Sequence, residues 1–309
     1  MKIGFFGHGP WAEKALKLLQ EKNVEISYIV TRYQNTPVVH CSLQTIAEKI
    51  NADFFCFKHI NDVEVVAQLK DYNVDLMVSM SFDQIIKYEL IQLSPLGFIN
   101  CHAGALPFYR GRNPLNWALI NGESEFGISV HYVDEGIDTG DIILQKMYAI
   151  DSSDHYAKLL DVAIDQCAVL LVSAIESVLG GTNNRIPQVS IHPVGFYCGR
   201  RREGDEKIIW PLTSMQLHNF IRALSHPGPC ARCLDENRRV MAIQNSQIIA
   251  DAPVYTATVG EVVGRDSRGV VVKTLDSSLR LTQVAWVEND EVGTSFVPQY
   301  PIGTRLMGF

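Results

Sequence analysis

The feature that most constrains this chain is the alternation of short apolar runs with amphipathic stretches over its N-terminal third. Residues 2–6 form the first apolar run, and further runs follow at 25–30, 53–57, 74–79 and 97–100, with helical patterns between them. Strands that alternate with helices are joined by right-handed crossovers and pair side by side in one direction. This part of the chain is therefore predicted to be an α/β domain with a mostly parallel, Rossmann-like sheet.

The pattern changes after Asn113. Residues 127–133 and 142–148 alternate in polarity like antiparallel strands, and a helical pattern runs from Ser153 to Leu179. The segment 182–205 is polar and irregular, and it is predicted to connect two domains.

The rest of the chain has the features of a small β domain. A helix is expected over 213–224, followed by short strands separated by turn signals. That spacing indicates an antiparallel β-barrel of OB-like form or a sandwich. The predicted domains are residues 1–205 and 206–309.

Charge and cysteine content exclude several classes. The chain has 27 Lys and Arg against 34 Asp and Glu, a net charge of −7, whereas proteins that neutralise many phosphates carry a basic surface. We therefore expect no nucleic-acid partner. The seven cysteines are odd in number and scattered, which is not a disulfide framework. The long apolar run 162–179 is interrupted by Asp165, Gln166 and Glu176, so no membrane span is expected. These features, with no secretory signal, predict a cytoplasmic protein.

A glycine pattern follows the first strand. Gly7, Gly9 and Ala12 match the G-x-G-x-x-A pattern of dinucleotide-binding loops. No acidic residue ends the second strand, but Arg32 stands there and suits the 2′-phosphate of NADP. A tight turn that packs a helix on the sheet is the favoured interpretation, and an NADP-dependent oxidoreductase remains the distant alternative.

A single CxxC, Cys230-Ala-Arg-Cys233, has no second pair to complete a four-ligand zinc site. It also follows Pro-Gly-Pro late in the chain, unlike a redox motif at a helix start. Two buried thiols are expected, and no metal.

The most informative segment is 98–141. Asn100 and His102 are two residues apart at the end of a predicted strand, so their side chains share one face. Asp138 lies in a turn bounded by Gly136 and Gly140. An amide, an imidazole and a carboxylate suit acyl transfer: the amide stabilises an oxyanion, the imidazole moves a proton, and the carboxylate stabilises the imidazolium. Taken singly, each residue also has a purely structural interpretation.

Together with their surroundings these residues resemble the N10-formyltetrahydrofolate-dependent formyltransferases. The resemblance is carried by Asn100-x-His102, Ala105-Leu-Pro-x-Tyr-Arg-Gly111, Asn116-Trp-Ala and Gly136-x-Asp138-x-Gly-x-Ile142. It implies that Asn100, His102 and Asp138 are the catalytic residues. It also implies that N10-formyltetrahydrofolate is the co-substrate and that the pterin is held by Met80, Ser81, Phe82, Asp83, Gln84, Ile85 and Ile86, with Glu135 and Asp138 on the other side. Relatives often have Ser where this chain has Gly104.

Three branches of the family compete. Glycinamide ribonucleotide formyltransferase is a single shorter domain, which disfavours it here. Methionyl-tRNA formyltransferase usually carries a basic insertion after the second strand, but residues 31–42 contain one basic residue, Arg32. Residues 206–309 contain 10 Lys and Arg against 10 Asp and Glu, a net charge of zero. Because phosphate contacts drive tRNA affinity, the tRNA enzyme becomes the alternative.

The third branch, the sugar-nucleotide N-formyltransferases, is the favoured one. The segments 110–117 and 198–201 look like the formyltransferase domain of the 4-amino-4-deoxyarabinose lipid A pathway. The predicted acceptor is a nucleotide-linked amino sugar for surface polysaccharide, whose pyrophosphate needs a few Arg side chains. The candidates are Arg110, Arg112, Arg200 and Arg201, although Arg110 equally suits a role in pinning its own loop. A homodimer is an expectation from the family.

Overall fold

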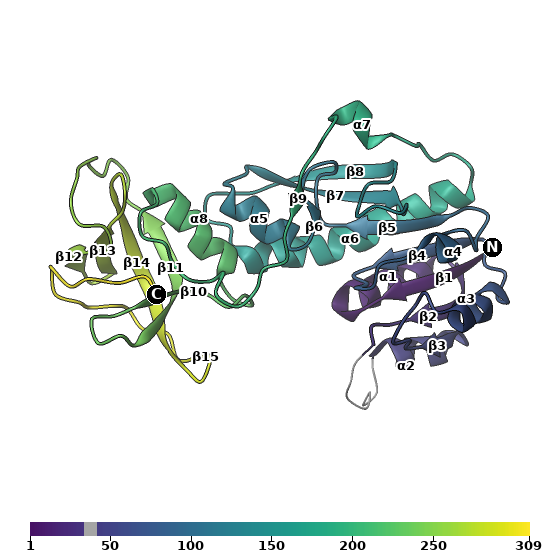
Figure 1. Cartoon of the computed structure of the whole chain (residues 1–309), viewed down its shortest axis with the longest axis horizontal. Helices are drawn as coiled ribbons and strands as arrows, with labels where there is room; N and C mark the ends of the chain where they lie inside the picture. Colours follow the sequence, from purple (N-terminus) through teal and green to yellow (C-terminus); the bar gives the residue numbers. More distant parts are fainter. Residues whose placement is uncertain (34–41) are drawn as a thin grey trace. The chain divides into compact units, whose positions relative to one another are not determined.

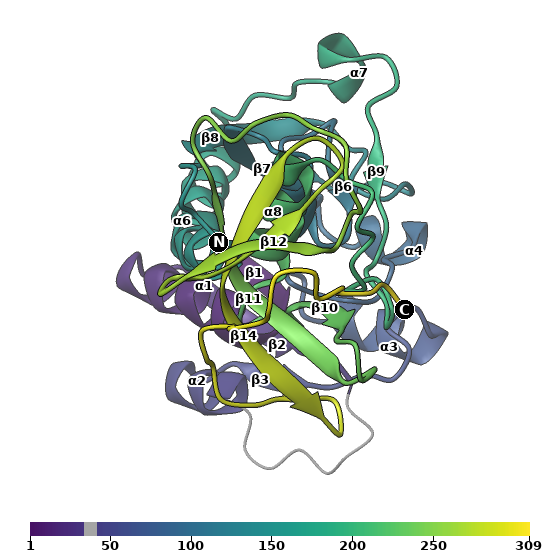
Figure 2. The same cartoon turned by 90° about the vertical axis from the view of Figure 1, so that its left-hand side faces the viewer.

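The computed structural model describes residues 1–33 and 42–309 (Figures 1 and 2). Its contacts divide the chain into two units, each built from several stretches. Unit 1 comprises Met1–Arg112, Phe126–Tyr148 and Asp161–Cys198, and unit 2 comprises Asn113–Glu125, Ala149–Leu160 and Gly199–Phe309.

Unit 1 contains a seven-stranded sheet in the order β3-β2-β1-β4-β5-β7-β8 (Figure 1). The first five strands of that order pair in parallel, and β7 runs antiparallel to β5. The predicted mostly parallel α/β sheet is thus confirmed. The strands are β1 (Lys2–Gly7), β2 (Glu25–Val30), β3 (Asp53–Phe55), β4 (Leu76–Met80), β5 (Phe98–His102), β7 (Glu125–Tyr132) and β8 (Ile142–Ala149).

Helix α1 (Gly9–Glu21) follows β1 directly and has Pro10 in its first turn, where a missing N–H costs nothing. A Cβ on Gly7 would lie 2.8 Å from the Ala12 Cβ and 3.0 Å from the Met80 carbonyl oxygen. Gly7 therefore allows close helix–strand packing, the interpretation favoured from the sequence. The remaining helices of this part of the chain are α2 (Ser42–Ile50), α3 (Val63–Lys70), α4 (Tyr88–Ile91), α6 (Tyr156–Leu179) and α7 (Gln188–Ile191).

Helix α6 starts three residues later than expected and ends before Gly180. Its 24 residues, with a mean hydropathy of 1.8 over the best window, make it long and apolar enough to cross a membrane. The polar residues that interrupt it therefore do not by themselves exclude a membrane span, contrary to the prediction. Its inner side is packed, with Ala163, Leu171 and Ile175 fully buried, while Asp165 pairs with Lys14. A core helix with a charged outer side passes the same length and composition test.

The segment after α6 differs from its prediction as a plain connection. Ile186 exchanges two 2.9 Å backbone hydrogen bonds with Ile142 of β8. Further on, β9 (Tyr197–Cys198) pairs in parallel with β6 (Arg110–Gly111). The prediction is therefore wrong for residues 182–198, which belong to unit 1, because their backbone groups complete its strands.

Unit 2 is an antiparallel β domain with two helices, α5 (Pro114–Ile120) and α8 (Ser214–Leu224) (Figure 1). Helix α8 begins with a capping box between Thr213 and Gln216, and the Asn116 amide of α5 donates to the Ala223 carbonyl at 2.7 Å. The sheet order is β10-β11-β14-β13-β12, with β15 on β14. The strands are β10 (Ala231–Leu234), β11 (Val240–Ile248), β12 (Val262–Asp266), β13 (Gly269–Lys273), β14 (Ser278–Glu288) and β15 (Glu291–Val292).

The C-terminal segment closes this sheet. Met307 pairs with Leu234 of the edge strand β10, while Val262 of the opposite edge strand donates to Thr304 at 2.8 Å. One short segment thus covers both edges, as in a barrel. The interior is a single apolar cluster that includes Trp210, Leu217 and Val272.

Candidate active site

The site begins with a row of three polar side chains on adjacent strands of unit 1. Ser79 of β4 pairs with Asn100 of β5, which pairs with His131 of β7. The Ser79 hydroxyl donates to the Asn100 Oδ1 at 2.6 Å, and the Asn100 Nδ2 lies 3.3 Å from the His131 Nε2. Asn100 has a partner on each side and is the middle residue of the five in β5, whereas the sequence predicted it at the carboxyl end of the strand, where the structure has His102.

His102 ends the same strand and is 8% exposed. Its Nε2 lies 2.7 Å from the carbonyl oxygen of Tyr109, which accepts only, so Nε2 carries a proton. The Nδ1 atom lies 3.7 Å from the Asp138 Oδ2. In the neutral imidazole, Nδ1 is therefore the basic atom, and it faces the carboxylate.

Asp138 lies between the two histidines. Its Oδ2 accepts from the Gly111 backbone N–H at 2.8 Å, and its Oδ1 is 3.4 Å from the His131 Nε2. The structure thus brings the three predicted residues, Asn100, His102 and Asp138, into one cluster and adds His131. Asp138 itself has a φ of 54°, whereas no positive φ is found at Gly136 or Gly140. Those glycines are needed because a larger residue would not fit: a Cβ on Gly140 would lie 2.0 Å from the Tyr132 carbonyl oxygen.

Electrostatics keep Asp138 ionised. Burial alone would raise its pKa, but the charge of His102, the hydrogen bond and charge of His131, and the Gly111 N–H outweigh burial and hold the pKa of Asp138 well below its usual range. The carboxylate is therefore charged at neutral pH and can stabilise an imidazolium beside it.

A glutamine far along the chain supports this aspartate. The Gln188 side chain donates from Nε2 to the carbonyl oxygens of Asp138 and Gly140, and its Oε1 accepts from the Nε and Nη2 atoms of Arg110. Gln188 is 3% exposed. Sequence reasoning missed Ser79, His131 and Gln188, because only the strand pairing and the return of segment 182–198 place them here.

The predicted pterin-binding turn, Met80 to Ile86, directly follows β4. The Asn61 and Arg112 side chains donate to its carbonyl oxygens at Ile85 and Asp83. The Gln84 side chain accepts from the Ile60 N–H and donates to the Phe57 carbonyl oxygen. The backbone N–H groups of residues 82–86 make no hydrogen bonds to other described residues. These free donors fit the recognition of a polar heterocycle by the main chain. Glu135 is exposed in the turn before Asp138.

The four candidate arginines have different environments. Arg110 is buried, with its guanidinium bound to Gln188 and the Val194 carbonyl, which favours the loop-pinning role. Arg112 is exposed and reaches the Asp83 carbonyl at 3.2 Å. Arg200 and Arg201 belong to unit 2, where Arg200 is exposed. Substrate contact by these residues stays a prediction.

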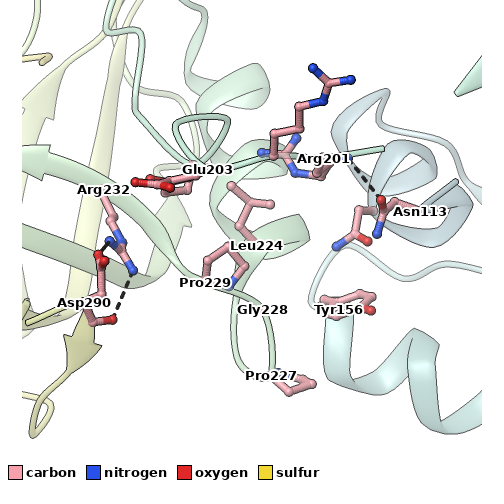
Figure 3. Close-up of a pocket in the computed structure, with 13 residues that line it drawn as sticks. Asn113, Tyr156, Arg201, Glu203, Leu224, Pro227, Gly228, Pro229, Arg232 and Asp290 are labelled. Carbon is pink, nitrogen blue, oxygen red and sulfur yellow. Dashed lines mark hydrogen bonds and ion pairs between the residues drawn. The ribbon is translucent and has the colours of Figure 1, made fainter. Parts of the chain in front are cut away.

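Unit 2 has a pocket of its own, of about 460 Å³ (Figure 3). Its walls come from the starts of α5 and α6, the segment 201–206, the loop 224–229 and β10. Three guanidinium groups (Arg201, Arg202 and Arg232) and three carboxylates (Glu203, Glu206 and Asp290) line it. Arg232 pairs with Asp290 at 2.9 Å, while its buried Nε has no hydrogen-bond partner. The pocket therefore offers both donors and acceptors.

The side chains of two other motifs make ordinary contacts within the protein. Arg32 donates to the backbone oxygen and the hydroxyl of Ser81. Cys230 and Cys233 are free thiols in the unit 2 interior, where burial raises the pKa of both. Within residues 1–33 and 42–309, no group of three His, Cys, Asp or Glu side chains has the arrangement of a metal site.

Residues 1–175 match the family described as "Formyl transferase", and residues 201–297 match "Formyl transferase, C-terminal domain". A methionyl-tRNA formyltransferase of Fusobacterium nucleatum is 33% identical over 285 residues, covering 90% of each chain.

Solved structures share the fold. The N-formyltransferase from Helicobacter canadensis, in complex with folinic acid and dTDP-3-aminofucose, superposes with a TM-score of 0.68 at 20% identity, covering 91% of this chain and 99% of that one. WlaRD, a sugar 3N-formyl transferase in the presence of dTDP and 5-N-formyl-THF, gives a TM-score of 0.67 at 21% identity, covering 94% and 99%.

Proposed function

The chain belongs to the formyl transferase family, and from that premise we propose that it transfers a formyl group from N10-formyltetrahydrofolate to the amine of a nucleotide-linked amino sugar. The reaction type is inferred from the cluster of Asn100, His102 and Asp138. The choice of acceptor is inferred from the charge distribution of the chain.

The formyl donor fits the residues present. The backbone N–H groups of residues 82–86 make no hydrogen bonds to other described residues, and this turn follows β4, which pairs with the strand of Asn100 and His102. Such donors suit a pterin with polar edges. The donor supplies an activated formyl carbon, so the protein needs to bind, orient and move one proton.

Each residue of the cluster has a distinct role. The Nδ2 group of Asn100 donates a hydrogen bond to the formyl oxygen as negative charge develops there. His102 takes the proton of the attacking amine on Nδ1, because Nε2 is committed to the Tyr109 carbonyl. Asp138, 3.7 Å from that Nδ1, then stabilises the imidazolium. As the bond between the formyl carbon and N10 breaks, the imidazolium gives that proton to N10 of the leaving tetrahydrofolate.

The acceptor follows from charge. Residues 206–309 have no net charge and residues 31–42 contain one basic side chain, so the electrostatic attraction that tRNA binding needs is missing. Residues 34–41 of that second segment lie outside the described part of the chain. A diphosphate needs only a few guanidinium groups, and the candidates from the sequence are Arg112, Arg200 and Arg201.

Formylation of methionyl-tRNA is the second candidate. The observation in its favour is the 33% identity to the methionyl-tRNA formyltransferase of F. nucleatum over nearly the whole chain. A shared ancestor explains that identity equally well if the acceptor changed while the catalytic cluster stayed.

A direct acceptor comparison tests the proposal. The purified chain is incubated with N10-formyltetrahydrofolate and either a panel of uridine and thymidine diphosphate amino sugars or charged initiator methionyl-tRNA. We expect one sugar nucleotide to gain a formyl group, observed by mass spectrometry, and His102→Ala to lower that rate about 10²–10³-fold. Efficient formylation of the tRNA, weakening steeply with added salt, would instead establish the second candidate.

A further inference from the structure

Arg32 has no role in the proposed function, although its side chain connects two strand ends of unit 1. It follows the end of β2 by two residues, and Ser81 directly follows β4. Strand β1 lies between β2 and β4 in the sheet. Because neighbouring strands are about 4.8 Å apart, the ends of β2 and β4 are separated by roughly 10 Å. Only a long side chain can bridge that gap, and Arg32 bridges it.

The guanidinium of Arg32 holds Ser81 at two points. Its Nε donates to the Ser81 carbonyl oxygen at 3.0 Å, and its Nη2 donates to the Ser81 hydroxyl at 3.3 Å. The Nε also lies 3.8 Å from the Asp83 Oδ1, within ion-pair distance. A guanidinium is planar and presents its donors in a rigid fork. The contact therefore fixes both the main chain and the side chain of Ser81, at the start of the predicted pterin-binding turn.

Ser81 needs this support because its backbone is left-handed. Its φ is 58°, which is unfavourable for residues other than glycine. The conformation occurs at the first residue after β4, where the chain leaves the sheet and enters the turn. The direction of the peptide groups that follow depends on it. Holding Ser81 in this conformation therefore sets the orientation of the backbone N–H groups of residues 82–86.

Other contacts of the turn leave the same N–H groups untouched. Arg112 donates to the Asp83 carbonyl oxygen, and Asn61 donates to the Ile85 carbonyl oxygen. Both contacts engage acceptors of the turn. The N–H groups of residues 82–86 make no hydrogen bonds to other described residues. The turn is thus anchored through its acceptors, and its main-chain donors are left for a ligand.

The same contacts disfavour the other use considered for Arg32, binding the 2′-phosphate of NADP. A phosphate at the Nε and Nη2 atoms would have to displace the two Ser81 oxygens. It would also approach the Asp83 carboxylate, whose charge has the same sign. Arg32 is therefore better suited to bind the turn than to bind an anionic ligand.

We propose that Arg32 is a positioning residue for the formyl donor: it holds Ser81 in the left-handed conformation and thereby directs the backbone N–H groups of residues 82–86 toward the pterin. The proposal rests on the donor site of the proposed function and is independent of the choice of acceptor. Arg32 touches neither substrate, so it affects the affinity for the donor and not the chemical step.

Binding of the donor can be measured without an acceptor. 5-Formyltetrahydrofolate, which has the same pterin but carries its formyl group on N5, is titrated by calorimetry into wild type and into Arg32→Lys. Lysine keeps the charge but lacks the rigid fork that reaches both Ser81 oxygens. We expect Kd to rise about tenfold, as for the loss of one charge-assisted hydrogen bond. An unchanged Kd overturns this proposal alone, whereas no binding to wild type overturns the donor site and the proposed function with it.

Arg268→Lys is the matched control. Arg268 lies in unit 2 and pairs with Asp266 at 3.2 Å, far along the chain from the turn. This variant is expected to leave Kd unchanged. NADPH is titrated in the same way, and saturable binding to wild type that Arg32→Lys weakens would overturn the proposal.

A glycine at position 81 separates positioning from direct contact with the ligand. Glycine adopts the left-handed conformation without support, so Arg32→Lys is expected to raise Kd less than about twofold in a Ser81→Gly background. An equal, larger rise in both backgrounds overturns the proposal, because Arg32 would then act on the ligand itself.

Steady-state rates with the acceptor from the comparison above give the second readout. We expect Arg32→Lys to raise the folate KM about tenfold, in line with Kd, while kcat stays within about twofold of wild type. A fall in kcat at saturating folate, or a rise in the acceptor KM alone, overturns the proposal, because Arg32 would then serve the reacting groups or the acceptor. Melting temperatures confirm that each variant is folded.

Discussion

The Gln188 side chain binds the main chain of Asp138: the glutamine Nε2 donates to the Asp138 carbonyl oxygen at 2.8 Å. The same nitrogen donates to Gly140 at 2.8 Å, and the Oε1 accepts from Arg110 at 2.7 and 3.0 Å. One buried amide thus ties the catalytic turn to the strand that carries Arg110. The left-handed backbone of Asp138 is unfavourable by itself, and this contact helps to maintain it.

Gln188→Glu tests that support. The carboxylate keeps the contact with Arg110 but loses the two N–H donors, and it places a negative oxygen against two carbonyl groups. We expect kcat to fall at least about tenfold and the free energy of unfolding to drop by roughly 2 kcal/mol for the unsatisfied buried acceptors. Ser190→Ala on the same helix, which loses one exposed contact to Pro187, is the control. Wild-type turnover in Gln188→Glu would show that Asp138 does not need this clamp.

The two aspartates of the turn are expected to behave differently. Asp138→Asn keeps the shape but removes the charge that favours imidazolium, so turnover is expected to collapse. Asp141 is more exposed and pairs with Arg185 at 3.9 Å, an ion pair worth at most about 1 kcal/mol. Asp141→Asn should therefore retain activity with a small loss of stability. Steady-state rates and melting temperatures decide; an active Asp138→Asn beside a folded, inactive Asp141→Asn would reverse the assignment.

The depressed pKa of Asp138 also predicts a pH dependence of stability. Because the folded state favours the ionised carboxyl, its contribution is complete above the unfolded-state pKa of about 3.9. It is lost as the pH falls through the lower, folded-state value. The melting temperature of wild type should thus exceed that of Asp138→Asn at neutral pH, and the gap should narrow only below about pH 4. A constant difference between the two melting temperatures from pH 7 to pH 3 would contradict an origin of this stabilisation in the charge of Asp138.

Gly104→Ser tests the space beside His102. A Cβ at position 104 would lie 2.6 Å from the His102 Nε2 and 2.8 Å from the Tyr109 carbonyl oxygen, the two atoms of one hydrogen bond. We expect the substitution to displace the imidazole and lower kcat by about tenfold or more. Gly199→Ser, where no atom lies within 4 Å of the added Cβ, should change little. Equal activity of the two variants would mean that the loop adjusts freely.

The sequence predicted those parts of the fold that depend on local patterns. The parallel strands, the antiparallel pair after Asn113 and the helix over 214–224 all follow from periodicity and end signals. The common position of Asn100 and His102 could be predicted, because residues two apart on one strand lie on the same face of the sheet. Ser79 and His131 were not, since their place beside Asn100 depends on the register between strands, which no short segment encodes.

Two further differences have physical causes. Arg110 resembles a phosphate-binding residue in sequence, but its partners come from Gln188 and Val194, more than seventy residues later. Glycine takes a left-handed backbone more readily than any other residue, and two glycines, Gly136 and Gly140, bound the turn of Asp138. In the structure they supply space for the Tyr132 carbonyl and the Thr139 side chain, while the aspartate takes the left-handed conformation.

The return of residues 182–198 to unit 1 also bears on how the protein is made. Chains fold from the N-terminus as they leave the ribosome, and by the time Asp138 emerges all five parallel strands have been synthesised. The residue that fixes its turn is still to come, fifty positions later. The nascent chain therefore contains all five parallel strands before the side chain that binds the Asp138 main chain has been synthesised.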